Sequence, residues 1–126
     1  RRSFADTVAM IDNSGVDWSR VVYHCFSEGP EEVRTLNERG GRASFTGIVT
    51  YKSAANVLAS ALAQGVEKLM LETDSPWLAP EPHRGGVNEP AFVALTAARI
   101  AEAMGVEVGQ LAEITSRNAE SFFEIT

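Results

Sequence analysis

Hydrophobic residues recur along the chain with two different spacings. A spacing of about 3.6 residues, which is typical of amphipathic helices, predicts helices over residues 3–14, 30–39 and 53–64, and two more that end near residues 104 and 123. Short runs rich in β-branched and aromatic residues predict strands over residues 21–26, 42–49 and 68–73. Because strands and helices alternate, we expect an α/β protein built from βα units on a parallel sheet.

Glycine, proline and serine residues mark the predicted helix ends. Gly15, Gly40 and Gly65 follow the first three helices, where glycine commonly ends a helix. Pro30 fits the first position of the second helix, and we expect Ser53 to cap the third. The apolar positions predicted for these helices are Phe4, Val8 and Ile11 in the first and Val57, Leu58 and Leu62 in the third.

The composition fits one ordinary globular domain, residues 1–126, with 44% hydrophobic and 22% charged residues. No apolar run approaches the ~20 residues that cross a bilayer, and the start of the chain does not resemble a signal peptide. Cys25 is the single cysteine, so we expect a reducing, cytoplasmic setting. The net charge of −6 argues against nonspecific wrapping of nucleic acid. It leaves room for a nuclease, since bound cations can supply positive charge within a site.

Candidate chemistry lies where two of the predicted strands end. His24 stands among apolar residues, so a buried imidazole would need a partner, which is either a metal ion or a backbone group. Asp74 follows the third strand, where α/β folds commonly carry catalytic carboxylates; the alternative is that it only caps a turn. Residues two apart in a strand share a face, so Glu72 should lie beneath Asp74. A buried carboxylate there would hold a neighbouring metal ligand in place.

The segment 75–90 is long and rich in proline and glycine, which sets it apart from a minimal connection. It carries His83 and Arg84, and an arginine can engage a phosphate through two parallel hydrogen bonds. The alternative is a surface turn whose basic pair is solvated. We expect Asn88 or Glu89 to cap the helix that follows, and Cys25 to be a small buried side chain without reactivity.

Several motifs resemble those of the TatD family of metal-dependent hydrolases, in the family's order and at about its spacing. They are residues 24–27 (HCFS), 44–52 (SFTGIVTYK), 71–80 (LETDSPWLAP), 82–85 (PHRG), 88–90 (NEP) and 115–119 (TSRNA). Each motif alone is weak evidence, whereas the set covers nearly the whole chain.

The resemblance implies a TIM-like (β/α)₈ barrel of the amidohydrolase type that hydrolyses DNA from the 3′ end in its best-known members. It implies that His24 and Asp74 are metal ligands, and that Asp74 holds or deprotonates the attacking water. Divalent ions, two in number and of Mg, Mn or Zn, would be the cofactors, and DNA or another nucleic acid the substrate. His83 and Arg84 match a loop at the mouth of the site, and we expect them to contact substrate phosphates.

The remaining ligands of the family lie on strands that have no counterpart here. The chain has two histidines, three predicted strands and about half the ~250 residues of such a barrel. We therefore expect residues 1–126 to be the C-terminal half of a single barrel domain, comprising strands six to eight and their helices. Without the missing N-terminal half, the chain would be inactive and have exposed strand edges. Two other functions stay open, namely a D-aminoacyl-tRNA deacylase of the same fold and a catalytically inactive half-barrel that serves as an interaction module.

Overall fold

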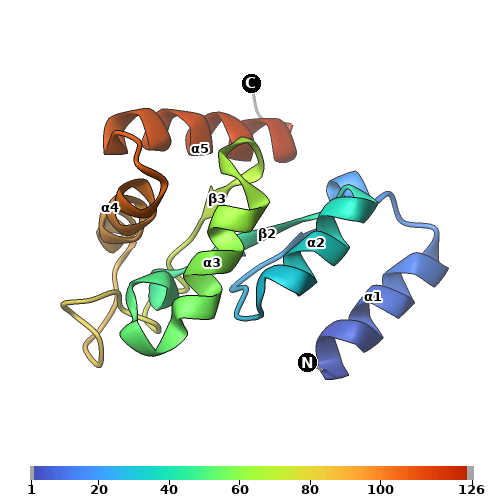
Figure 1. The fold of residues 1–126 in the computed structure, drawn as a ribbon, viewed down its shortest axis with the longest axis horizontal. Coiled ribbons are helices and arrows are strands. Elements are labelled where there is room, and N and C mark those ends of the chain that lie inside the picture. Colours follow the sequence, from blue (N-terminus) through green and yellow to red (C-terminus); the bar gives the residue numbers. More distant parts are fainter. Residues whose placement is uncertain (1, 125–126) are drawn as a thin grey trace.

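The computed structural model describes residues 2–124 and has the expected alternation of strands and helices (Figure 1). The strands and helices are α1 (Arg2–Ser14), β1 (Val22–Tyr23), α2 (Pro30–Arg39), β2 (Arg42–Phe45), α3 (Ala55–Gln64), β3 (Met70–Leu71), α4 (Val93–Met104) and α5 (Val108–Phe122). Short 3₁₀ turns cover Trp18–Arg20, Gly47–Thr50, Lys52–Ala54, Val66–Lys68 and Pro90–Phe92.

The three strands form one parallel sheet in the order β1-β2-β3. Tyr23 lies beside Ala43, and Phe45 lies beside Leu71, so these four side chains point to the same face of the sheet. Side chains alternate along a strand, so the residues one position away face the opposite side. That second group comprises Val22, His24, Arg42, Ser44, Met70 and Glu72. The register therefore separates an apolar face from a face that carries the candidate site residues.

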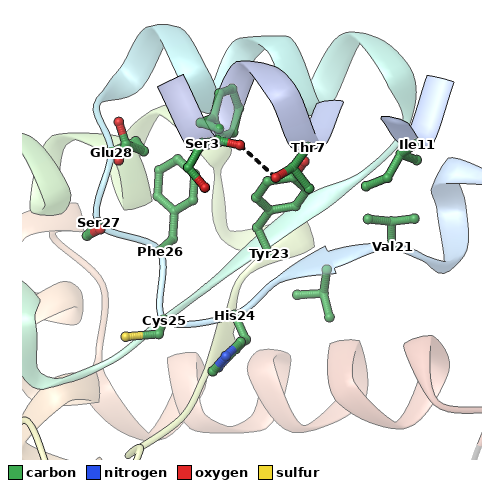
Figure 2. A pocket seen from close by; sticks show the side chains of 12 residues that line it. Ser3, Thr7, Ile11, Val21, Tyr23, His24, Cys25, Phe26, Ser27 and Glu28 are labelled. Carbon is green, nitrogen blue, oxygen red and sulfur yellow. Dashed lines mark hydrogen bonds between the residues drawn. The ribbon is translucent and has the colours of Figure 1, made fainter. Parts of the chain in front are cut away.

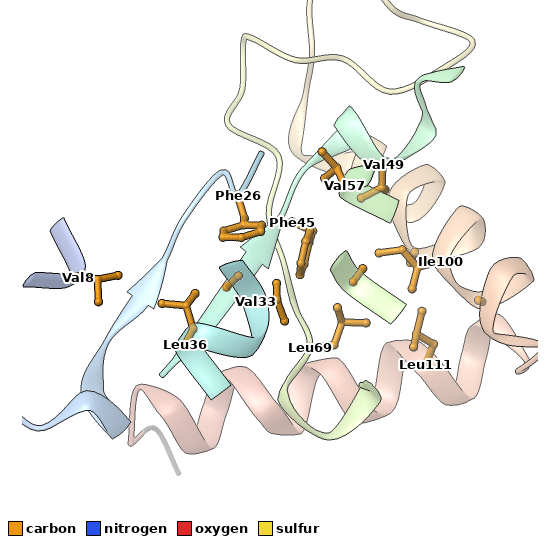
Figure 3. Packing of buried hydrophobic residues seen from close by; sticks show 14 residues of the cluster. Val8, Phe26, Val33, Leu36, Phe45, Val49, Val57, Leu69, Ile100 and Leu111 are labelled. Carbon is orange, nitrogen blue, oxygen red and sulfur yellow. The ribbon is translucent and has the colours of Figure 1, made fainter. Parts of the chain in front are cut away.

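The apolar face packs against the helices and forms the core (Figure 3). Phe45 is fully buried and meets Phe26 edge-on at a centroid distance of 5.8 Å. Val33 and Leu36 of α2 are also fully buried, as is Leu111 of α5. Fully burying such a side chain contributes about 1.5–3 kcal/mol. Burial on the side of the sheet that the helices cover thus stabilises the fold, and the candidate site residues lie on the opposite side.

The strands are shorter than the patterns predict, and each ends for a local reason. β2 stops at Phe45 because the hydroxyl of Thr46 accepts a hydrogen bond from the Ile48 N–H and begins a 3₁₀ turn. β1 stops before Cys25, whose backbone adopts a positive φ of 53°. The third strand is shortened at both ends to Met70–Leu71, and Lys68 at its predicted start belongs to the 3₁₀ turn Val66–Lys68. Apolar β-branched runs are therefore compatible with turns when a side chain or a glycine caps them.

One prediction for the third helix is wrong. Ser53 does not cap it: Ser53 lies in the preceding 3₁₀ turn, and α3 begins at Ala55 without a side-chain cap. Leu62 is 41% exposed, because α3 faces the interior along Val57, Ala61 and its neighbours. The small side chain of Ala61, which is fully buried, permits close packing on that side. Helical periodicity alone does not tell whether the buried side of α3 is centred on Ala61 or on Leu62, because the two positions are adjacent.

β1 and β3 lie at the two edges of the sheet among the described residues. On the α1 side of β1, Phe4 packs against Tyr23 with ring centroids 5.3 Å apart. Figure 2 shows Tyr23 and Phe26 pointing toward α1, while His24 points away from it. Within residues 2–124, no helix has the length and apolar character needed to span a membrane.

Candidate metal centre at the carboxyl edge of the sheet

Three titratable side chains converge where β1 and β3 end. His24 follows β1 directly, Glu72 follows β3 directly, and Asp74 comes two residues later. Each offers a ligand atom, and these atoms lie within 4.8 Å of one another. The strands are parallel, so their carboxyl ends meet at one edge, and residues far apart in sequence become neighbours.

Glu72 connects the other groups at this edge. Its Oε1 lies 3.2 Å from His24 Nδ1, and its Oε2 accepts a 2.7 Å hydrogen bond from the Cys25 N–H. The Ser44 hydroxyl donates a further short hydrogen bond to Oε2. Both carboxylate oxygens are therefore engaged with groups from β1 and β2. A carboxylate bonded to Nδ1 fixes the ring orientation and directs Nε2 outward, which is how proteins commonly position a metal-binding histidine.

Backbone geometry at Cys25 and Asp74 supports this arrangement. Both residues have left-handed backbone conformations, with φ of 53° and 55°. Aspartate adopts this region with modest strain, whereas cysteine seldom does. At Cys25 the turn accompanies the hydrogen bond from its N–H to Glu72.

The turn that carries Asp74 is held from the other end of its loop by Asn88. This side chain is 3% exposed, and its Nδ2 donates to the carbonyl oxygens of Thr73 at 2.6 Å and Trp77 at 2.8 Å. The Asn88 N–H donates to the Pro76 carbonyl at 2.9 Å. Neither Asn88 nor Glu89 caps the following helix through its side chain, so that prediction is wrong: Glu89 only occupies the N-cap position of the 3₁₀ turn Pro90–Phe92, and α4 has no side-chain cap. Asn88 Oδ1 accepts the Glu89 N–H instead, and its amide group holds the Asp74 turn.

The expectation of a buried imidazole at His24 is wrong: the side chain is 72% exposed. Of its apolar neighbours, Tyr23 and Phe26 point toward α1, whereas His24 points to the opposite side, as Figure 2 shows. Cys25 is half-buried. Burial raises the pKa of its thiol, the nearby charges of Asp74 and Glu72 raise it further, and a hydrogen bond with Thr46 acts in the opposite direction. A protonated thiol fits a packing role better than a nucleophilic one.

His83 and Arg84 lie in the same long loop but outside the cluster. The His83 ring stacks on Phe92, with centroids 4.3 Å apart and planes inclined by 6°. The Arg84 guanidinium lies 3.9 Å from the centre of the Tyr51 ring, and its Nη1 is 3.5 Å from the Ser53 hydroxyl. Both basic side chains are therefore ordered by contacts with other rings.

The donor set suits a divalent cation. Nitrogen and oxygen ligands lie about 2.0–2.2 Å from such a metal, so two ligand atoms sharing it are at most about 4.4 Å apart. The ligand atoms lie within 4.8 Å of one another, so a bound ion would draw them together by up to about 0.4 Å. Among residues 2–124, neither His24 Nε2 nor the Asp74 carboxylate has a hydrogen-bond partner, whereas both Glu72 oxygens do. Nε2 and Asp74 are thus the available donors, and Glu72 orients His24.

Sequence reasoning missed Ser44 and Tyr51. A serine inside an apolar strand was the available signal for Ser44, but the strand register is needed to place it against Glu72. Tyr51 belongs to a motif, yet only the fold brings its ring under Arg84.

Comparison with known proteins decides the family. The family model described as "TatD related DNase" matches residues 1–124. The chain belongs to this family. It is 40% identical over 125 residues to the uncharacterized metal-dependent hydrolase YcfH of Escherichia coli K12, covering 99% of this chain and 47% of that protein. It is 33% identical over 125 residues to the uncharacterized metal-dependent hydrolase YabD of Bacillus subtilis, covering 99% of this chain and 49% of YabD. The chain thus spans about half the length of these relatives.

Solved structures of the family confirm the fold. The TatD homologue YjjV of Escherichia coli matches with a TM-score of 0.87 at 22% identity, over 100% of this chain and 48% of YjjV. A TatD-family hydrolase of Entamoeba histolytica matches with a TM-score of 0.84 at 18% identity, over 97% of this chain and 48% of its own. The parallel sheet with its helices is therefore the architecture of half a TIM-like barrel.

Proposed function

We propose that this chain contributes part of the active site of a divalent-metal-dependent hydrolase that cleaves phosphodiester bonds in DNA. The observation that carries the proposal is the convergence of His24, Glu72 and Asp74, with Glu72 bonded to Nδ1 of His24. The description of the matching family as a DNase and the names of its relatives as metal-dependent hydrolases support the choice of reaction.

His24 and Asp74 would bind the metal through Nε2 and a carboxylate oxygen. Bound there, a divalent ion lowers the pKa of water and neutralises charge on phosphoryl oxygens. Asp74 is the residue we assign as proton acceptor for the attacking water, because a carboxylate held by a fixed turn can orient that water. Glu72 keeps the imidazole in place. Two metal ions need more protein ligands than His24 and Asp74 supply. We therefore assign the remaining metal ligands to residues outside this chain.

Arg84 and His83 are the residues that we assign to substrate. Arg84 pairs with no carboxylate within 4.0 Å among residues 2–124, so its charge is available to an anion. His83, which precedes Arg84 in sequence, is held by its stacking on Phe92. These two side chains would contact phosphates at the mouth of the site.

The test uses the intact protein, meaning the natural polypeptide that contains this chain, and end-labelled single-stranded DNA. We expect cleavage that needs a divalent metal, is abolished by Asp74→Asn and proceeds from the 3′ end. Isothermal titration with Mn²⁺ should show weaker binding for His24→Gln and Asp74→Asn, with thermal unfolding as the check on folding. Arg99→Gln, which removes a surface ion pair on α4, is the control variant.

The outcomes separate the alternatives. Hydrolysis of D-aminoacyl-tRNA without cleavage of DNA would replace the proposed substrate by an aminoacyl ester. Absence of both activities together with absence of metal binding would refute the enzyme and favour an interaction module.

A further inference from the structure

Tyr51 has a position that the metal centre does not explain. It follows the 3₁₀ turn Gly47–Thr50, which comes directly after the end of β2. Its ring is half-buried beneath the Arg84 guanidinium at 3.9 Å, and its hydroxyl donates a 2.8 Å hydrogen bond to the Ala79 carbonyl. Tyr51 therefore contacts the long loop 75–90 at two points, the Ala79 carbonyl and the Arg84 guanidinium.

Other contacts fix the same part of the loop. The Glu81 N–H donates to the Thr50 hydroxyl at 2.8 Å, and the His83 N–H donates to the Pro80 carbonyl at 2.7 Å. These bonds fix the backbone at Glu81 and His83, just before Arg84, and the Tyr51 ring holds the Arg84 guanidinium. An arginine stacked on an aromatic ring keeps its N–H groups free at the edge of the plane, and it loses less side-chain freedom when an anion binds.

Tyr51 lies beyond the carboxyl end of β2, the strand between the two that lead to His24 and Asp74. Burial raises the pKa of its hydroxyl, the positive charge of Arg84 lowers it, and the charges of Glu81 and Cys25 raise it. The three strands are parallel, so Tyr51 and the residues of the metal centre lie at the same edge of the sheet. A phosphate chain bound at the centre would extend toward a cation already in position.

We propose that Tyr51 is a positioning residue that holds Arg84 ready to bind a substrate phosphate, with Ser53 completing the contact through its hydroxyl. This inference rests on the proposed phosphodiester hydrolysis. Its consequence is that the Tyr51 ring contributes to binding of the polyanion rather than to the chemical step, whereas the hydroxyl only helps to fix the loop backbone at Ala79.

The test compares two substitutions of Tyr51 in the intact protein with single-stranded DNA as substrate. Tyr51→Leu removes the ring, and we expect KM to rise by about 3- to 10-fold with kcat unchanged. Tyr51→Phe keeps the ring and should restore KM to within about twofold of wild type. Arg84→Ala should raise KM by about 10-fold or more, and adding Tyr51→Leu to it should change nothing further.

The salt dependence of KM gives a second test, because it would not change if Tyr51 had only a structural role. Losing one phosphate contact should lower the slope of log KM against log salt by about 0.7 for single-stranded DNA, for Tyr51→Leu but not for Tyr51→Phe. Equal effects of Tyr51→Leu and Tyr51→Phe, or additive effects of Tyr51→Leu and Arg84→Ala, would overturn the inference. A wild-type protein that binds Mn²⁺ but cleaves no DNA would instead refute the proposed function, so the two failures are distinguishable.

Discussion

Gly47 is the position where a single methyl group should most clearly disturb the link between the sheet and the site loop. A Cβ built on this buried glycine would lie 2.6 Å from the Leu78 carbonyl oxygen and 2.8 Å from the Pro80 nitrogen. Favourable separations between such atoms begin near 3.5 Å, so the loop backbone must withdraw by about 1 Å. Gly47 is not among the glycines with positive φ, so the effect of alanine would be steric alone.

We expect Gly47→Ala to lower the free energy of unfolding by about 1–3 kcal/mol, the usual cost of overpacking. The matched control is Gly109→Ala on α5, where the nearest atom to a new Cβ is the flexible Glu107 Oε1 at 3.4 Å. Alanine in that helix should be neutral or raise the free energy of unfolding by about 0.5–1 kcal/mol.

Urea unfolding of the intact protein, monitored by circular dichroism, measures both changes. Because the displaced segment also carries Arg84, Gly47→Ala should in addition raise KM for DNA. Stabilities that agree within about 0.5 kcal/mol for the two variants would refute the close approach of this loop to Gly47.

Three further predictions concern positioning and charge. Glu72→Gln should weaken Mn²⁺ binding by about 10- to 100-fold in isothermal titration, because a neutral amide orients His24 less strongly; unchanged affinity would contradict this role. Asn88→Ala should lower the free energy of unfolding by about 1–3 kcal/mol in urea, since two loop carbonyls lose their donor. A hydrogen bond from Arg39 lowers the pKa of Asp12, so this pair stabilises the fold above about pH 4 and less as the pH falls. Asp12→Asn should therefore reduce the fall in melting temperature as the pH is lowered below about 4. An unchanged dependence of the melting temperature on pH would contradict the role assigned to the Asp12–Arg39 pair.

Much of the architecture was determined by the sequence itself. The periodic apolar positions and the glycines at helix ends located α1 and α2 to within a residue or two, since each helix has its own local signals. The placement of Asp74 beyond the third strand was predicted from the sequence, whereas its proximity to Glu72 involves a left-handed turn at Asp74, because β3 ends at Leu71. The motif set predicted the family, and the family match over residues 1–124 confirmed it.

The burial of individual side chains was decided by the tertiary structure. His24 and Leu62 both stand among apolar residues, yet both are exposed, because burial depends on which face meets a neighbouring element. Strand length also depended on context, since Thr46 ends β2 within a run that a strand pattern would continue. Local propensity is too weak to override such contacts.

The assembly of the site depended on strand register. Ser44 and Glu72 are 28 residues apart, and Arg84 is 33 residues from Tyr51, so no local pattern could pair them. The sequence alone located the polar residues that follow each strand, because hydrophobic periodicity and turn residues mark strand ends within a few positions. Only the parallel pairing of the strands decided which of those side chains meet, because hydrogen bonding between strands joins segments that are remote along the chain.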